Sequence, residues 1–398
     1  MKQLQAHIEQ IKVAFQSMQS KEDLLRVLNE AKPLLYGAKI VPFELKQITW
    51  YANPKFGIRR YTEFTIKKKS GAVRCIHAPI NGLKALQKTL GFVLQCVFEP
   101  HSSAMGFVFN KSIVNNAQVH VGQNYVYNID LKDFFPSIDQ ARVWKTLQLK
   151  PFNLTGNKQV LSNIIASLCC TQMDVERKDE NGEWEKVRRN VLPQGAPTSP
   201  VITNIVCQKL DYLLTAVAKR FSLKYSRYAD DITFSSMHNV YHSESDFIKE
   251  LHRIIAEQNF HIKESKTRLQ KEGYRKEVTG LLVNEKVNVQ QRYIKQLRMW
   301  LYYWERYGYE RASEFFLRQY ITDKGHVKKG KPDMAMVISG KLDYLKMVKG
   351  ADNELYLKLK SRFELLIGFE DPINQVLNLW ETVGIEQAME FYYKDKFN

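Results

Sequence analysis

The sequence predicts an α+β protein, in which a region of mixed helices and strands gives way near residue 285 to a mostly helical C-terminal region. Segments with period-two spacing or β-rich composition fall between Tyr61 and that point. Beyond Gln290 the spacing becomes helical, because Ile294, Leu297 and Leu301 recur at steps of three and four residues and form one apolar face. No repeat of fixed period and no low-complexity tract interrupts this order.

The first half of the chain alternates between helical and strand-like spacing. The first fifty residues read as helical, and Ser20 with Asp23 forms a capping-box pattern ahead of an apolar run. Residues Tyr61–Pro79 alternate with period two, which predicts a hairpin with Ser70 and Gly71 at its turn. The next segments predict a helix, a strand and the start of a helix in turn: Leu83–Phe98, Tyr125–Leu131 and Val143–Leu147.

The region from residue 180 to residue 290 predicts further strand pairs and helices. Glu180–Glu183 is a turn between polar strands, and Ser199 is placed to cap a helix that carries Pro200 in its first turn. The run KYSRYADDITFSS predicts two strands joined at Ala229-Asp230-Asp231. A helix over Ser245–Asn259 and a second hairpin over GLLVNEKVNV complete this region.

Composition and charge favour a globular protein that binds a polyanion. The chain has 398 residues, enough for two or three domains, with 44% hydrophobic and 25% charged residues. Its net charge of +17 favours phosphate-rich partners, since each neutralised phosphate releases counterions. No apolar run approaches the roughly 20 residues that span a bilayer, and the N-terminus is polar, so we expect no membrane segment or signal peptide. Five cysteines without CxxC spacing favour a reduced, cytoplasmic protein.

Two carboxylate clusters are candidates for metal chemistry. Asp130 ends the apolar run YVYNID, and Asp230 and Asp231 lie at the tip between two predicted strands. Either cluster alone is more often a turn or a cap. Carboxylates on adjacent strand ends, however, can hold two Mg²⁺ ions about 4 Å apart, the arrangement that stabilises both oxygens of an in-line phosphoryl transfer.

These motifs resemble the palm of reverse transcriptases. The resemblance rests on Tyr228-Ala-Asp-Asp231 after NIDLKDFFPSI, with further blocks in the family's order between Tyr61 and Arg298. It implies a right-hand polymerase with fingers, an antiparallel-sheet palm and an α-helical thumb with a C-terminal extension. It also implies an RNA-directed DNA polymerase with two Mg²⁺ ions, or Mn²⁺ as a substitute. Asp130, the Leu131 carbonyl and Asp230 are then the metal ligands, with Asp231 as a ligand or a close neighbour.

The same resemblance places five residues around an incoming deoxynucleoside triphosphate. Arg74 in VRCIHAP is similar to the fingers arginine that contacts the triphosphate, and Lys266 in KESKT to the lysine near the leaving pyrophosphate. Gln194 and Gly195 lie at the centre of LPQGAPTSP, where glycine permits close approach of the nucleotide. Phe135 matches the aromatic that excludes a ribose 2′-hydroxyl. The alternative is that it is a core residue, as we expect of Phe134.

Two shorter motifs resemble retron reverse transcriptases in particular. Asn116 and His120 form the NAxxH signature, and Thr279 is the centre of the VTG signature. Retron enzymes copy a cognate structured noncoding RNA into branched single-stranded DNA from a guanosine 2′-hydroxyl, commonly in antiphage defence. The resemblance therefore implies this RNA and an RNA–DNA product as partners, with these residues helping to shape the RNA-contact surface. For His120 the alternative is a buried structural histidine.

The C-terminal part predicts a basic helix face and an acidic tail. Lys295, Arg298 and Arg306 share one face with Tyr302, and we expect them to bind the template–primer duplex. The tail from Asp371 carries five acidic residues and two lysines, which predicts a docking surface for an effector protein or another copy. The extra length leaves open a different defence-associated enzyme with unconventional priming. A group II intron protein and an inactive RNA-binding protein remain further alternatives.

The expected domain organisation has four parts. Residues 1–60 form an N-terminal helical segment and residues 61–124 form the fingers. Residues 125–285 form a palm with a finger insertion, and residues 286–398 form a helical thumb with a C-terminal extension.

Overall fold

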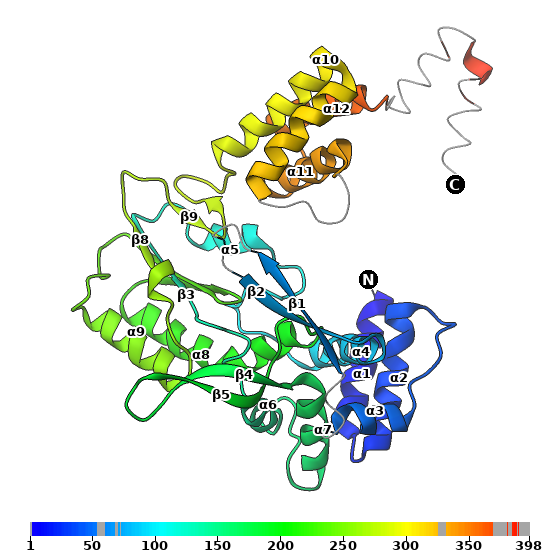
Figure 1. The fold of residues 1–398 in the computed structure, drawn as a ribbon, viewed down its shortest axis with the longest axis vertical. Helices are drawn as coiled ribbons and strands as arrows, with labels where there is room; N and C mark the ends of the chain where they lie inside the picture. The colour runs from blue at the N-terminus through cyan, green and yellow to red at the C-terminus, as the bar shows by residue number, and fades with distance from the viewer. Residues whose placement is uncertain are drawn as a thin grey trace. The chain divides into compact units, whose positions relative to one another are not determined.

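The computed structural model describes residues 2–53, 60–67, 71, 73–324, 332–368, 380, 384–387 and 389 (Figure 1). The chain forms two compact units. The first contains Met1–Thr279 and Val283–Lys286, and the second contains Gly280–Leu282 and Val287–Asn398. The finer division of the first unit at residues 60 and 124 stays a prediction.

The first unit begins with helices that pack on one another. They are α1 (Lys2–Ser17), α2 (Lys21–Tyr36), α3 (Leu45–Ala52) and α4 (Asn81–Val97). The predicted capping box is confirmed, because the Ser20 hydroxyl accepts from the Asp23 amide at 3.2 Å and the Asp23 carboxylate accepts from the Ser20 amide at 3.1 Å. Helices α1 and α2 lie beside α4 (Figure 1), and the shared core includes Phe15, Leu28 and Leu90.

The predicted hairpin between α3 and α4 is confirmed. Strands β1 (Tyr61–Lys67) and β2 (Val73–Pro79) pair antiparallel, from Tyr61 opposite Pro79 to Lys67 opposite Val73. Of its predicted turn, Gly71 is described with a positive φ of 81°, whereas Ser70 lies outside the described residues.

A four-stranded antiparallel sheet forms the centre of the first unit, in the order β6-β7-β3-β8. Its strands are β3 (Tyr125–Asp130), β6 (Lys224–Tyr228), β7 (Asp231–Ser236) and β8 (Arg268–Gln270). Strand β3 follows the short helix α5 (Ile113–Val119), and α9 (Asp246–Glu257) and the turn η3 (Glu264–Lys266) connect β7 to β8. The register places Asp130 opposite Asp231, so the predicted strands bring the carboxylate clusters to one end of the sheet.

Between β3 and β6 the chain adds three α-helices, one short 3-10 helix and a second hairpin. They are α6 (Gln140–Leu147), η2 (Gly156–Lys158), α7 (Gln159–Cys169), β4 (Thr171–Lys178), β5 (Trp184–Val191) and α8 (Ser199–Arg220). The prediction that Ser199 caps α8 was wrong by one residue. Thr198 is the N-cap, because the Ser199 hydroxyl instead donates to the Pro193 carbonyl at 2.7 Å and fixes the preceding loop.

Helix α8 combines 22 residues with an apolar composition, so it is the one helix in the described chain that meets a simple length-and-hydropathy test for crossing a membrane. This test is weak for a single helix. Two thirds of its most apolar window is buried inside the protein, as in the core helix of a soluble domain.

The second unit is mainly helical. The short strand β9 (Glu277–Val278) still belongs to the first unit. The second unit contains the short strand β10 (Leu281–Leu282) and the helices α10 (Gln291–Lys324), α11 (Met334–Lys349) and α12 (Glu354–Leu366). The predicted apolar face of α10 is confirmed by the burial of Ile294, Leu297, Leu301 and Trp304. Gly308, with a φ of 76°, breaks α10 into two helical halves. Most of the acidic tail from Asp371 lies outside the described residues.

Candidate active site

Three aspartates lie at one end of the central sheet. Asp130 is the last residue of β3 and is buried, with 7% of its surface exposed. Asp230 lies in the two-residue loop between β6 and β7, and Asp231 begins β7 directly opposite Asp130. The Asp230 carbonyl accepts from the Leu131 amide at 3.1 Å, which fastens the loop to the end of β3. The sheet therefore brings together the residues predicted to act as catalytic and metal-binding groups.

The loop that carries Asp230 has a strained backbone. Ala229 has a φ of 58°, a left-handed conformation that costs an L-residue about 1–2 kcal/mol. Gly106 packs against this loop so closely that a Cβ there would lie 2.5 Å from the Ala229 nitrogen. Strain of this kind persists only where the surroundings determine the conformation. The neighbouring chain thus fixes where Asp230 stands.

A buried ion pair holds the base of this loop, and the sequence analysis did not identify it. Arg227 and Asp211 are 0% and 1% exposed in their side chains, and their charged atoms are 2.6 Å apart. Arg227 also donates to the Ala229 carbonyl at 3.2 Å and to Asn204 at 3.2 Å. Burial alone would lower the pKa of Arg227, but Asp211 raises it overall. The available signal was the aspartate in a largely apolar helix, because β6 has the mixed sequence KYSRY and does not mark Arg227 as buried.

Burial and mutual repulsion raise the pKa values of Asp230 and Asp231. Burial raises the pKa of Asp230, and Asp130 adds to the rise while Lys266 and Arg74 oppose it. The pKa of Asp231 rises to about 6, first through burial and then through Asp230 and Asp130, although part of its side chain is exposed. Lys266 partly offsets this crowding, because its Nζ lies 2.5 Å from Asp130 Oδ2.

The donor set fits divalent cations. Carboxylate oxygens are the ligands that Mg²⁺ and Mn²⁺ prefer, and a cation would relieve the repulsion that raises the pKa values of Asp230 and Asp231. In the described part of the chain the three carboxylates do not converge within 4.8 Å of one another. Closer approach of three like charges is unfavourable without a cation between them.

The two neighbouring phenylalanines differ as predicted in their exposure. Phe134 is 3% exposed and packs against Phe260, with ring centroids 5.6 Å apart. Phe135 is half-buried, and its ring faces Phe107 at 6.2 Å. Phe107 is itself 39% exposed and has a φ of 62°. Phe135 is therefore only partly enclosed, although it packs against the core, and its role in sugar selection stays a prediction.

The predicted nucleotide contacts from the fingers lie on β2 and the loop beside it. Arg74 is exposed on β2, near enough to Asp230 to affect its pKa. The Gln194 carbonyl accepts from the His77 amide at 2.9 Å. Gly195 has a φ of 127°, and a Cβ there would lie 2.7 Å from the His77 carbonyl oxygen. Residue 195 must therefore be glycine because it packs against β2, a reason that could not be seen in the sequence. The contacts of these residues with a nucleotide stay predictions.

The residues of the NAxxH motif lie inside the protein. Asn116 and His120 are 1% and 0% exposed. Ser226 of β6 donates to Asn116 at 2.6 Å, so it must accept from His120 Nε2 at 2.7 Å, while Ser235 of β7 bonds to His120 Nδ1 at 2.7 Å. Burial lowers the pKa of His120 to about 3 and keeps the ring neutral. This placement fits the structural alternative and not direct contact with RNA.

Thr279 connects to the same network. It accepts a hydrogen bond from Asn116 at 3.4 Å and donates to the Ile113 carbonyl at 3.4 Å. Its φ of 47° is left-handed, a strained conformation for a β-branched residue. We therefore interpret Asn116, His120 and Thr279 as positioning residues that hold α5 against β6 and β7.

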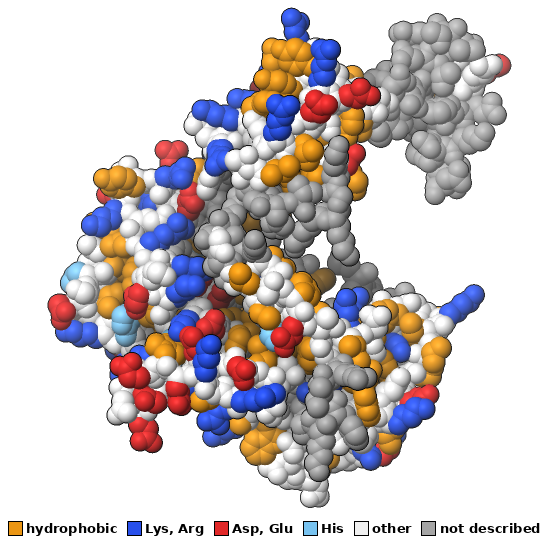
Figure 2. Space-filling view, viewed as in Figure 1, with side chains coloured by type: hydrophobic (Ala, Val, Ile, Leu, Met, Phe, Trp, Pro, Cys, Tyr) orange, Lys and Arg blue, Asp and Glu red, His pale blue; other side chains and the backbone are white. Residues whose placement is uncertain are grey.

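The predicted basic face of α10 is exposed. Lys295, Arg298 and Arg306 all face solvent beside the exposed Tyr302. Lys295 also lines a cavity of about 450 Å³ with Arg318, a residue from the other half of α10 that the sequence analysis missed. Figure 2 shows Lys and Arg side chains spread over the visible face of the helical unit, among exposed hydrophobic ones. The charge and exposure suit a polyanion.

Comparisons with known proteins place this site in a family. A family profile described as reverse transcriptase (RNA-dependent DNA polymerase) matches residues 66–295. The Retron Ec86 reverse transcriptase of Escherichia coli is 36% identical over 247 residues, which cover 60% of this chain and 68% of that protein. The Retron Mx162 reverse transcriptase of Myxococcus xanthus is 35% identical over 262 residues, which cover 62% of this chain but only 52% of that protein.

Solved structures show weaker similarity. A telomerase from Candida albicans, in complex with a TWJ fragment of telomeric RNA, has a TM-score of 0.39 and 10% identity, covering 82% of this chain and 66% of that chain. An apo telomerase from Candida tropicalis has a TM-score of 0.37 and 14% identity, covering 62% and 59%. Similarity at this level adds nothing to the assignment.

Proposed function

Because the chain belongs to the reverse transcriptase family, as a retron-type member, we propose that it synthesises DNA on an RNA template. One observation carries the proposal. The sheet places Asp130, Asp230 and Asp231 at one end, with Lys266 bonded to Asp130 and Arg74 close enough to affect Asp230. Here clustered carboxylates stand beside the basic side chains of Lys266 and Arg74. Such an arrangement suits phosphoryl transfer, in which negative charge shifts among the oxygens of a triphosphate.

Each residue at the site has a distinct part in this proposal. Asp130 and Asp230 would hold two Mg²⁺ ions, with the Leu131 carbonyl as a further oxygen ligand. When bound, such ions stabilise the attacking and leaving oxygens of an in-line displacement. Arg74 supplies planar donors for the triphosphate, and Lys266 supplies a charge close to Asp130 for the leaving pyrophosphate. The rigid loop at Ala229 keeps Asp230 in place during turnover.

Phe135 is proposed to select deoxynucleotides. A bulky ring beside the sugar leaves no room for a 2′-hydroxyl, so Phe135→Val should lower discrimination against ribonucleotides by about 10–100-fold. The measurement is the ratio of kcat/KM for a deoxynucleotide and the matching ribonucleotide in single-nucleotide extension. Phe109→Val is the matched control, because Phe109 lies in the same loop as Phe107 and is 83% exposed. Unchanged discrimination in Phe135→Val would make Phe135 a packing residue.

The basic face of α10 is proposed to hold the template–primer duplex by its phosphates. Replacing Lys295, Arg298 and Arg306 with glutamine should weaken duplex binding. The slope of log affinity against log salt concentration should become less steep by roughly 2–3, since each lost phosphate contact contributes nearly one unit. The measurement is a salt titration of duplex binding by fluorescence anisotropy.

The matched control for the basic face removes the same charge elsewhere. Lys21, Arg26 and Lys46 are exposed cations on the N-terminal helices, and their replacement lowers the net charge by the same three units. This variant should keep the parental salt slope. Equal slopes in all three proteins would mean that the α10 face is an ordinary solvated surface.

The retron resemblance supports a narrower proposal about substrate and biological role. The cognate template would be a structured noncoding RNA encoded beside the gene, and a guanosine 2′-hydroxyl of that RNA would prime DNA synthesis in the cytoplasm, in defence against phages. The chemistry suits the site, because a 2′-hydroxyl is an alcohol nucleophile like a 3′-hydroxyl. Presentation of the guanosine then depends on the folded RNA and its contacts with the protein.

Priming can be tested with the adjacent RNA and a generic annealed primer–template in parallel. The expected product on the cognate RNA is DNA joined through a 2′–5′ linkage, detected by its release with a debranching enzyme. Since Asn116 and His120 are buried positioning residues, His120→Ala should reduce synthesis on both substrates by similar factors. DNA joined to protein, or to nothing, would place the enzyme outside the retron mode of priming.

A further inference from the structure

The β1–β2 hairpin carries a group of metal-ligand side chains away from the catalytic aspartates. Glu63 of β1 and Cys75 and His77 of β2 each offer one ligand atom, and these atoms lie within 4.8 Å of one another. The register explains the cluster. Glu63 is directly opposite His77, and Cys75 is two residues from His77 on the same strand, so all three side chains share one face of the hairpin.

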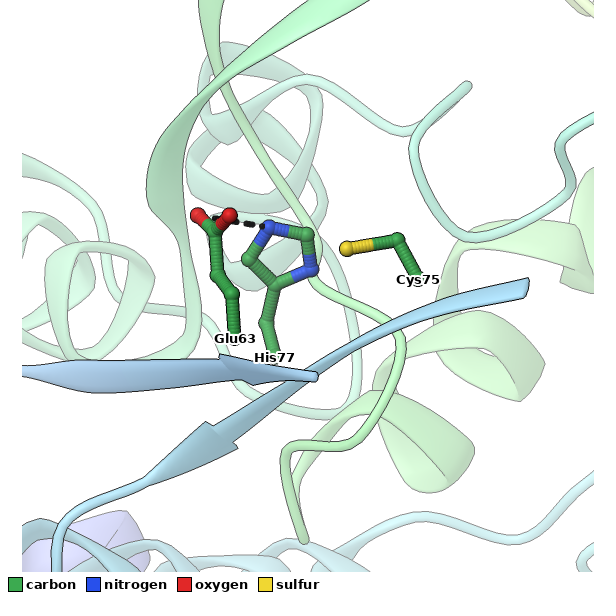
Figure 3. A group of neighbouring side chains, drawn as sticks. All are labelled: Glu63, Cys75 and His77. Carbon is green, nitrogen blue, oxygen red and sulfur yellow. Dashed lines mark ion pairs between the residues drawn. The ribbon is translucent and has the colours of Figure 1, made fainter. Parts of the chain in front are cut away.

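The histidine at the centre of the group has an unused nitrogen. His77 is 6% exposed, and its Nε2 lies 3.2 Å from the Glu63 carboxylate. Its other ring nitrogen, Nδ1, is buried without a hydrogen-bond partner, whereas most buried polar atoms have one. Figure 3 shows the ring between Glu63 and Cys75, with this second nitrogen on the side of the Cys75 sulfur. Because Glu63 lies on the Nε2 side of the ring, an ion bound by all three residues would take Nε2 in place of the present ion pair, and Nδ1 would keep its proton.

We propose that Glu63, Cys75 and His77 bind a Zn²⁺ ion, separate from the cations of the active site. Zinc accepts carboxylate oxygen, thiolate sulfur and imidazole nitrogen together, whereas Mg²⁺ and Ca²⁺ prefer oxygen alone. On binding, the Cys75 thiol gives its proton to water and a zinc–sulfur bond forms. Three protein ligands leave the fourth tetrahedral position to a water molecule.

The position of the cluster predicts what the ion does. Arg74 lies between Cys75 and the turn, and its side chain alternates to the opposite face of β2. The His77 amide bonds to the Gln194 carbonyl at 2.9 Å, in the loop beside the active site. A zinc ion would tie β1 to β2 across this point, and so stiffen the strand that presents Arg74. Its role is structural support of the fingers hairpin.

Cobalt is the probe that reports the thiolate directly. Metal-free full-length protein titrated with Co²⁺ should develop one equivalent of a sulfur-to-cobalt charge-transfer band in the near ultraviolet, and Zn²⁺ should abolish it. Cys75→Ser should lose the band, and Glu63→Gln should weaken zinc binding by at least about tenfold. Cys96→Ser is the matched control, because Cys96 is a half-buried free thiol on α4, and it should bind like the parent.

This readout does not depend on polymerase activity. The inactive variant Asp230→Ala should therefore show the same sulfur-to-cobalt band as the parent. Absence of the band in the parent protein would overturn the proposal. So would a band that survives in Cys75→Ser, or zinc affinity that is unchanged in Glu63→Gln. Circular dichroism spectra that match the parent's confirm that the exposed position of Cys75 tolerates serine.

Discussion

Replacing Asp230 or Asp130 with alanine is expected to abolish DNA synthesis while leaving the fold intact. Each change removes an oxygen ligand of the proposed cations, whose stabilisation of the transition state is worth several kcal/mol. Four kcal/mol corresponds to a loss of about a thousandfold in rate. The measurement is single-turnover extension of a primer on an RNA template by purified variants, with thermal unfolding as the check on folding.

The raised pKa values of Asp230 and Asp231 give this prediction a second readout. Burial and the neighbouring carboxylates oppose ionisation of Asp230 in the folded protein, so Asp230→Ala should make the cation-free protein no less stable than the parent near neutral pH. In contrast, Mg²⁺ should stabilise the parent more than Asp230→Ala, because only the parent has the full ligand set. DNA synthesis retained by Asp230→Ala would contradict the assignment of the active site.

Breaking the buried ion pair beneath the catalytic loop is expected to have the largest effect on stability. Arg227→Met leaves the buried carboxylate of Asp211 without its partner charge, and Asp211→Leu leaves the buried guanidinium of Arg227 without its own. Either change should cost about 3–5 kcal/mol, because an unpaired buried charge is strongly unfavourable. The double variant should recover much of that loss, since it leaves neither charge unpaired. Urea unfolding of all four proteins measures this coupling.

Activity should not return in the double variant, because Arg227 also holds the Ala229 carbonyl of the loop. The matched control is Arg253→Met. Arg253 pairs with Glu257 at 2.6 Å, but both side chains are more than half exposed, so its loss should cost no more than about 1 kcal/mol. Unfolding of Arg227→Met at the parental urea concentration would contradict the role of the pair.

Much of the fold was predictable because local signals agreed with the final structure. The alternating hairpin at Tyr61–Pro79, the capping box at Ser20 and the apolar face of α10 all formed as expected. The cap of α8 was misplaced because Ser199 uses its hydroxyl for the Pro193 carbonyl, an interaction set by the folded loop. Glycine at residue 195 was attributed to nucleotide approach, whereas packing on His77 already requires it.

Features that depend on distant partners could not be predicted from spacing. The partners of His120, Ser226 and Ser235, come from two strands more than a hundred residues along the chain, so the burial of the motif was invisible in the sequence. The ion pair of Arg227 with Asp211 likewise joins a strand to a helix. By contrast, the aspartates were predictable because Asp130 ends β3, Asp231 begins the paired strand β7, and Asp230 directly precedes it.

The central claim is that this chain copies RNA into DNA at Asp130 and Asp230. Its most direct measurement uses purified protein, a heteropolymeric RNA template with an annealed DNA primer, the four deoxynucleoside triphosphates and Mg²⁺, followed by sequencing of the product. The account predicts DNA complementary to the template, made by the parent protein and not by Asp230→Ala. Failure of the folded parent protein to extend the primer on RNA, with either Mg²⁺ or Mn²⁺, would contradict it.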